Sequence, residues 1–386
     1  MITIDKLNFR TEILKQCNAG TQEIEELLKY NNRYFDHSYN EEISLPLEDE
    51  RHIEVWEDYI EEAKEKGTFA TLKEKLVQFN FLIKEGISEQ SFYKDVTLRG
   101  KDIDEVPEAT ELELERPEKL ELTVEQTIAG KIPVLKVKHR PDFVSIIQAI
   151  LKKNEPQEIP DSMGATMISG YNNWDRIRRY KEEWLNDNLA WNWRKEFKRL
   201  ISKKELYQDK FMVLSDNNYS AISAKELNLS EAEWREYSLK IRLGHESTHY
   251  FTKRALGSME THLLDELIAD YMGLSNALGY YKAKWFLKFM GVEGSTKYRE
   301  GGRLENYVDR NLLSRSSFEI LQRLVRKAAM NLEKFDKLYL NEENDYKKLM
   351  TLTYFTLEEL AVDKAIELLN DRFTKVTKIN IMEINN

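Results

Sequence analysis

The sequence predicts an α+β fold in which helices predominate. Apolar residues recur at helical spacing through most of the first hundred residues and again beyond residue 314. Short runs with the alternation typical of strands are confined to the middle of the chain. With 386 residues, 41% of them hydrophobic, the chain can bury a sizeable core in one large or two coupled domains.

Three regions follow from these patterns. Residues 1–115 are expected to be helical, with helices near 10–31, 51–66 and 69–85 and an acidic, proline-containing connection at 102–118. Residues 116–290 are expected to form an α/β lobe that carries the functional helices. Its elements are strands at 120–128 and 132–138, a helix at 142–153, and a strand pair at 210–214 and 219–222. Residues 291–386 are expected to form a helical C-terminal lobe, with a long helix near 314–340.

The candidate chemistry lies in His245-Glu246-Ser247-Thr248-His249. Two histidines four positions apart lie about 40° from each other around an α-helix, so both imidazoles can reach one metal ion. Glu246 lies on the flank of that pair, where it can hold a water bound to the same ion. A third protein ligand would leave one coordination position open, as a catalytic zinc requires.

Two helices are expected to carry the site. Ser230 and Glu233 fit a capping box for the first, Gly257 fits its C-terminal cap, and Gly244 would let another backbone approach closely. The second follows a turn at 257–259 and ends at about residue 278, before Gly279. It is apolar nearly all round, so it is expected to be buried, with small residues along the stripe that faces a neighbouring helix.

Glu266 and Asp270 lie one turn apart on this second helix. Carboxylates on a buried helix are costly unless they are paired or bind a metal. Glu266 is therefore expected to be the third metal ligand.

This pattern, His245-Glu246-x-x-His249 followed by Glu266-x-x-x-Asp270, resembles the gluzincin branch of the zinc metallopeptidases over about residues 230–278. The resemblance implies one Zn²⁺ per chain held by His245, His249 and Glu266, with Glu246 as general base. It also implies that Asp270 orients His245 through a hydrogen bond. Sixteen residues separate His249 from Glu266, slightly fewer than in many members, so Asp270 is the alternative third ligand.

The resemblance further implies a zincin-like core: a mixed α/β lobe, the motif helix, then a helical lobe, here with an added N-terminal helical region. Such a metallopeptidase cleaves a peptide substrate beside a sheet edge, for which the strand at 165–170 is the candidate. The polar cluster at 172–176 either lines the cleft or starts a helix capped by Asn173. Arg303 and Tyr307, in a loop beyond the site helices, are candidate catalytic groups that stabilise the oxyanion. That loop could equally be ordinary surface, and His262 could either assist the site or serve packing.

Composition limits the partners and the cellular location that we expect for this chain. The net charge of −10 argues against nucleic acid and anionic membranes as partners, and no apolar run approaches the length of a membrane span. Without a recognisable secretion signal, and with Cys17 as its only cysteine, the chain is expected to be cytoplasmic. Two other classes remain open. They are a non-hydrolytic enzyme with two histidines and one carboxylate on iron, such as an oxygenase, and a binding protein with a structural metal site.

Overall fold

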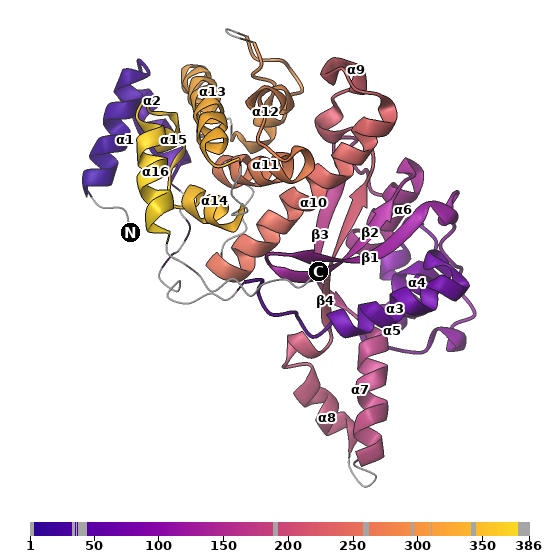
Figure 1. Cartoon of the computed structure of the whole chain (residues 1–386). Helices are drawn as coiled ribbons and strands as arrows, with labels where there is room; N and C mark the ends of the chain where they lie inside the picture. Colours follow the sequence, from indigo (N-terminus) through magenta and orange to yellow (C-terminus); the bar gives the residue numbers. More distant parts are fainter. Residues whose placement is uncertain are drawn as a thin grey trace. The chain divides into compact units, whose positions relative to one another are not determined.

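The structure is a computed structural model that describes residues 4–32, 35, 37, 45–187, 192–257, 262–294, 297–309, 311–340 and 345–376. The chain is mostly helical with one four-stranded sheet, as expected for the α+β class (Figure 1). It divides into two compact units, residues 47–217 and residues 1–46 with 218–386. We call them the sheet unit and the helical unit.

The sheet unit contains the whole sheet, whose strand order is β1-β2-β4-β3. The strands β1 (Leu120–Thr127) and β2 (Gly130–Val137) form a hairpin. Strand β4 (Gln208–Ser215) runs parallel to β2, and β3 (Ala165–Asn172) pairs antiparallel with β4 at the edge. Strands β1, β2 and β4 and the segment at 165–170 are therefore strands, as the sequence predicts.

Helices α3 (Ile53–Lys66), α4 (Thr68–Lys75) and α6 (Arg140–Leu151) pack with the sheet into one apolar cluster. Trp56, Phe143 and Phe211 of β4 are fully buried in this cluster, and the ring centroids of Trp56 and Phe211 are 4.8 Å apart. The helix expected at 69–85 ends at Lys75, because residues 77–80 tighten into a 3-10 turn.

A second apolar cluster joins α5 (Ser91–Arg99), α7 (Trp174–Asp187) and α8 (Trp193–Leu200). Asn173 accepts hydrogen bonds from the backbone N–H groups of Asp175 and Arg176 through Oδ1, at 3.0 and 3.3 Å. Trp174 is buried and donates to the carbonyl of Thr97. The polar cluster at 172–176 therefore starts a helix, the second of the two alternatives that its sequence left open.

In the helical unit, the N-terminal helices pack with the C-terminal ones. Helix α1 (Ile4–Gln16) contacts α15 (Leu357–Ala361), and α2 (Thr21–Tyr30) contacts α13 (Arg315–Leu338). Arg10 and Glu358, both fully buried, form a two-pronged ion pair between α1 and α15. Helices α14 (Asp345–Leu352) and α16 (Ala365–Lys375) pack against each other.

These units divide the chain at other positions than the three regions expected from the sequence. Residues 4–32 pack with the C-terminal helices, whereas residues 47–115 pack with the sheet. The single helix expected at 10–31 is two helices, separated at residues 17–20, where Asn18 has a left-handed backbone.

The strand expected at 219–222 is not a strand. Residues Tyr219–Ala221 form a 3-10 turn in which Ser220 and Ala221 have φ angles of 53° and 57°. Two successive left-handed residues cannot continue an extended ladder, so the chain turns a corner there instead. The hydrophobic alternation at this position reflects a buried corner.

Within the described ranges, none of the helices combines the length and the apolar character that a membrane crossing needs.

Candidate metal centre

The two histidines lie on helix α10 (Glu231–Leu256), which is labelled in Figure 1. It begins at a capping box in which Ser230 accepts from the backbone N–H of Glu233, whose carboxylate accepts from Ser230 in return. It ends at Gly257, whose φ of 67° is the left-handed conformation that favours glycine. Both boundaries are those predicted from the sequence. His245 and His249 therefore lie in the regular interior of the helix, where spacing fixes their common direction.

Helix α11 (Leu263–Leu278) positions the acids. It ends at Gly279, as predicted, and nearly all its residues are buried. Its start is capped by His262, and residues 258 and 259 of the turn expected at 257–259 lie outside the described residues.

Two glycines let α10 and α11 approach closely. A Cβ atom on Gly244 would lie 2.9 Å from the Cα of Gly273, and a Cβ on Gly273 would lie 2.6 Å from the carbonyl oxygen of Ile241. Neither position has room for a larger residue without a shift of the backbone. The close contact expected at Gly244 is therefore present, and it sets the distance between the histidine and glutamate helices.

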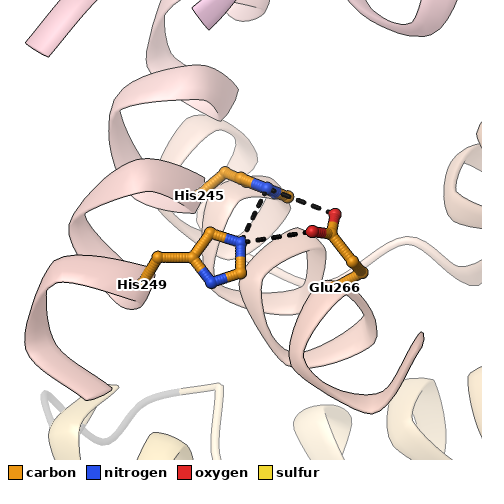
Figure 2. A group of neighbouring side chains, drawn as sticks. All are labelled: His245, His249 and Glu266. Atoms are coloured by element: carbon orange, nitrogen blue, oxygen red, sulfur yellow. Dashed lines mark hydrogen bonds and ion pairs between the residues drawn. The ribbon is translucent and has the colours of Figure 1, made fainter. Parts of the chain in front are cut away.

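His245, His249 and Glu266 converge at this contact (Figure 2). The two Nε2 atoms are 3.1 Å apart, and Oε2 and Oε1 of Glu266 lie 3.5 Å from the Nε2 atoms of His245 and His249 respectively. All three side chains are buried. Their ligand atoms can hold one metal ion.

The donor set fits zinc. Zinc binds imidazole nitrogen and carboxylate oxygen at about 2.0–2.2 Å in a tetrahedron, which places ligand atoms about 3.4 Å from one another. The observed separations of 3.1 and 3.5 Å agree with this value. The same residue types also suit other transition metals, iron included.

Asp270 contacts His245 and is not one of the three residues whose ligand atoms cluster. Its Oδ1 atom lies 2.9 Å from Nδ1 of His245, which leaves Nε2 facing Glu266. Since Nδ1 and Nε2 lie on different edges of the ring, Asp270 meets His245 on the edge away from the ligand atoms. This is the arrangement that the resemblance implied for Asp270, and the alternative with Asp270 as third ligand is not what the geometry shows.

Glu246 is half-buried beside the histidine pair. Its negative charge is among the causes that raise the pKa of His249, so its carboxylate is electrostatically close to the ligand cluster. Within the described ranges its side chain has no hydrogen bond or ion pair. Among the residues that the structure describes, none therefore occupies its carboxylate.

Arg303 and Tyr307 reach the site from a 3-10 helix, η7 (Arg303–Tyr307). The Tyr307 hydroxyl donates to Oε2 of Glu266 at 2.8 Å, and Nη2 of Arg303 donates to the same oxygen at 3.1 Å. Arg303 also pairs with Asp270, with Nη2 3.2 Å from Oδ2. Both residues predicted in this loop therefore lie at the site. The Tyr307 hydroxyl and Nη2 of Arg303 are directed at the carboxylates of Glu266 and Asp270, and not at a position for an oxyanion. Tyr298, from the same loop, instead donates to the Gly302 carbonyl.

His262 serves packing. Its Nδ1 accepts from the Leu264 backbone, and its Nε2 lies 2.9 Å from the Tyr30 carbonyl of α2. Tyr30 in turn donates to the Tyr307 carbonyl at 2.9 Å. Helix α2 therefore supports the η7 segment that contacts Glu266.

The electrostatics of the cluster favour a cation. Burial raises the pKa of Glu266, but its hydrogen bond to His249 and the charges of both histidines and Arg303 outweigh burial, so the net shift is downward. The pKa of Asp270 is also lowered, because Arg303 and the bond to His245 overcome its burial. Burial lowers the pKa of His249, yet its contact with Glu266 produces a net rise. When both histidines are neutral, the carboxylates of Glu266 and Asp270 carry a charge of −2 and the Arg303 guanidinium carries +1. A bound metal ion would balance the remaining charge of −1.

Tyr219 is a site residue that the sequence analysis missed. Its hydroxyl donates to Oδ1 of Asp270 at 2.5 Å and accepts from Nη1 of Arg303 at 2.8 Å. No local signal marks it, because it lies 26 residues before His245, in a segment that reads as a strand.

Comparison with known proteins gives one match. Residues 12–364 match a family of unknown function, DUF7005. The chain belongs to this family. No curated protein and no solved structure matches the chain. The region shared with DUF7005 includes the three ligand residues, Asp270, Arg303, Tyr307 and Tyr219.

Proposed function

We propose that this DUF7005 protein is a zinc-dependent hydrolase, a metallopeptidase that cleaves a peptide or amide bond. The observation that carries the proposal is the convergence of the Nε2 atoms of His245 and His249 with the Glu266 carboxylate. Glu246 lies beside them, and its side chain has no hydrogen bond or ion pair with any described residue. Three protein ligands leave a coordination position for water, as in catalytic zinc sites.

His245, His249 and Glu266 would hold the zinc, which supplies Lewis acidity and a water of lowered pKa. Glu246 would accept one proton from the attacking water as the water oxygen adds to the carbonyl carbon. It would then pass this proton to the amine as the C–N bond breaks. Asp270 holds the His245 ring with Nε2 toward the ligand cluster. Arg303 and Tyr307 hold Oε2 of Glu266, which leaves Oε1 as the less occupied oxygen for ligation.

Glu246 is also the reason to favour hydrolysis over oxygenation. An iron oxygenase with two histidines and one carboxylate has no evident need for a free carboxylate beside the ligands, whereas hydrolysis needs a base there. Cytoplasmic location and a peptide or protein substrate belong to the same proposal, with neither nucleic acid nor a membrane as partner.

The test begins with the metal. Elemental analysis of the purified protein is expected to give about one zinc per chain, lost in His249→Ala. One iron per chain, or full zinc retention in His249→Ala, would contradict the assignment.

The second step separates base from ligand. Glu246→Gln is expected to keep zinc and to lose hydrolysis of a fluorogenic peptide library, by about 10²-fold or more. Glu236→Gln is the matched control, because Glu236 is exposed on the same helix and pairs with Lys240 at 2.7 Å. If Glu246→Gln remained active, Glu246 would not be the general base.

A further inference from the structure

The corner that precedes α10 brings one buried phenol into the centre of the site network. Tyr219 is 5% exposed, and its hydroxyl lies between Asp270, Arg303 and His245. The hydroxyl is 3.2 Å from Nδ1 of His245, so it contacts both members of the His245–Asp270 pair.

The hydrogen bonds of the Tyr219 hydroxyl indicate what this group does in the site. Oδ1 of Asp270 accepts from the Tyr219 hydroxyl, at 2.5 Å, and lies 2.9 Å from Nδ1 of His245. Because an ionised carboxylate can only accept, this second contact requires a proton on Nδ1. Because Arg303 donates to the Tyr219 oxygen, the phenol proton is directed toward Asp270. Tyr219 therefore holds Oδ1 of Asp270, the atom that contacts the His245 ring.

The backbone after Tyr219 is held in an uncommon conformation. Ser220 and Ala221 are both left-handed without being glycine, a conformation that L-residues other than glycine seldom adopt. Such strain persists only where surrounding contacts impose it. Here Arg303 donates to the Ser220 hydroxyl at 3.0 Å, and the Ile222 carbonyl accepts from the Trp234 indole at 2.7 Å.

The same corner is tied to the motif helix at its start. The backbone N–H of Tyr219 donates to the Ser238 hydroxyl of α10 at 3.1 Å, and the Tyr219 ring packs edge-on against Phe289 of α12 (Ala283–Met290). The phenol therefore has one position relative to the helix that carries His245. If Tyr219 only filled space in the core, the backbone around it would not need hydrogen bonds on both sides of the turn.

We propose that Tyr219 is a positioning residue of the metal centre. Its hydroxyl holds Oδ1 of Asp270 in place, and this selects the His245 tautomer with the proton on Nδ1 and the free electron pair of Nε2 directed at the metal. The inference rests on the proposed function only in naming the metal and the reaction. The hydrogen-bond chain itself exists among the protein's own side chains.

The test compares Tyr219→Phe with Tyr346→Phe. The first removes only the hydroxyl from the network, whereas the Tyr346 hydroxyl, also buried, has no hydrogen-bond partner in the part of the chain described. Tyr346 belongs to α14, and its ring contacts Phe251, so its variant reports the general cost of removing a buried phenol oxygen.

The first readout needs no metal. In the metal-free protein, the ¹⁵N imidazole signals of His245, assigned by their loss in His245→Asn, are expected to show a proton on Nδ1. Tyr219→Phe is expected to shift these signals toward a mixture of tautomers, and Tyr346→Phe to leave them unchanged. Unchanged His245 signals in Tyr219→Phe would overturn the proposal, whatever the protein hydrolyses.

The second readout is zinc affinity, measured by competition with a chromogenic chelator. Tyr219→Phe is expected to weaken zinc binding by about 10-fold, the lower end of the range for groups that orient metal ligands. Its kcat should fall with KM unchanged, because the hydroxyl touches no substrate. If His245 shifts while the wild-type protein shows no hydrolysis, the proposed function fails and the role of Tyr219 stands. If zinc affinity and the His245 signals both stay at wild-type values, the role of Tyr219 fails and the proposed function stands.

Discussion

Replacing Gly273 by alanine tests whether the close approach of α10 and α11 sets the metal-site geometry. The new Cβ atom would lie 2.6 Å from the Ile241 carbonyl oxygen and 3.3 Å from the backbone nitrogen of His245. Ordinary contact begins at 3.4 Å, so the two helices must separate locally by about 0.8 Å, the difference between 3.4 and 2.6 Å. Both colliding groups on α10 are backbone atoms, so no side chain can rotate away.

The expected cost follows from two opposing effects. Overpacking a core costs about 1–3 kcal/mol, and a backbone clash belongs at the upper end. Alanine recovers about 1 kcal/mol of helix propensity relative to glycine. The free energy of unfolding should therefore fall by about 2 kcal/mol. For a unit of this size, that corresponds to a Tm lower by about 4–8 °C.

The same displacement should also weaken metal binding. Zinc tolerates ligand distances within about 0.2 Å, and a separation of α10 from α11 moves Glu266 away from both histidines. We expect Gly273→Ala to reduce zinc affinity by about tenfold or more. Gly244→Ala, which introduces the clash from the opposite helix, should act in the same direction.

Thermal melts with zinc and with a chelator, together with chelator competition, measure both effects. Gly20→Ala is the control, because its Cβ would meet only the end of the flexible Glu23 side chain, and its cost should stay below about 1 kcal/mol. If Gly273→Ala melts at the wild-type temperature and keeps full zinc affinity, the helix contact does not set the site.

Two further predictions concern the acids and pH. Glu266→Gln should weaken zinc binding more than Asp270→Asn does, because the first removes a charged ligand and the second an orienting group, worth about 10–100-fold; chelator competition that gives the reverse order would exchange their roles. Zinc should raise Tm less as pH falls from about 8 to about 6, because the raised pKa of His249 makes the metal compete with a proton. In the metal-free protein the signs differ by group. The His249 contribution to stability is present below its unfolded pKa and is lost as pH rises through its raised folded value. The contributions of Glu266 and Asp270 are present above their unfolded pKa values and are lost on acidification. A zinc-induced Tm shift that does not depend on pH would contradict the contact between His249 and Glu266.

Much of the local structure could be predicted from the sequence. The capping box at Ser230 and the glycines at 257 and 279 mark helix ends that the structure places at the same residues. These signals are readable because caps depend on backbone groups only a few residues away. The β1–β2 hairpin around Gly130 is predictable for the same reason.

The composition of the two units could not be predicted in this way. The sequence pattern groups residues 1–115 as one helical region, but α1 and α2 pack with α15 and α13, more than 280 residues away. Amphipathic spacing shows that a helix has a face to bury and does not name the partner. The buried pair of Arg10 with Glu358 arises only when that partner is present.

The sequence by itself determined which side chains could share a metal, because helical spacing directs His245 and His249 alike and burial of the following helix makes Glu266 costly without a ligand. Only the tertiary structure decided how these ligands are held. Tyr219 and Arg303 contact Asp270 from segments 51 and 33 residues away. The left-handed corner at Ser220 and Ala221 contains no glycine from which the sequence could predict it. Such contacts depend on how distant segments pack, which a pattern of neighbouring residues does not contain.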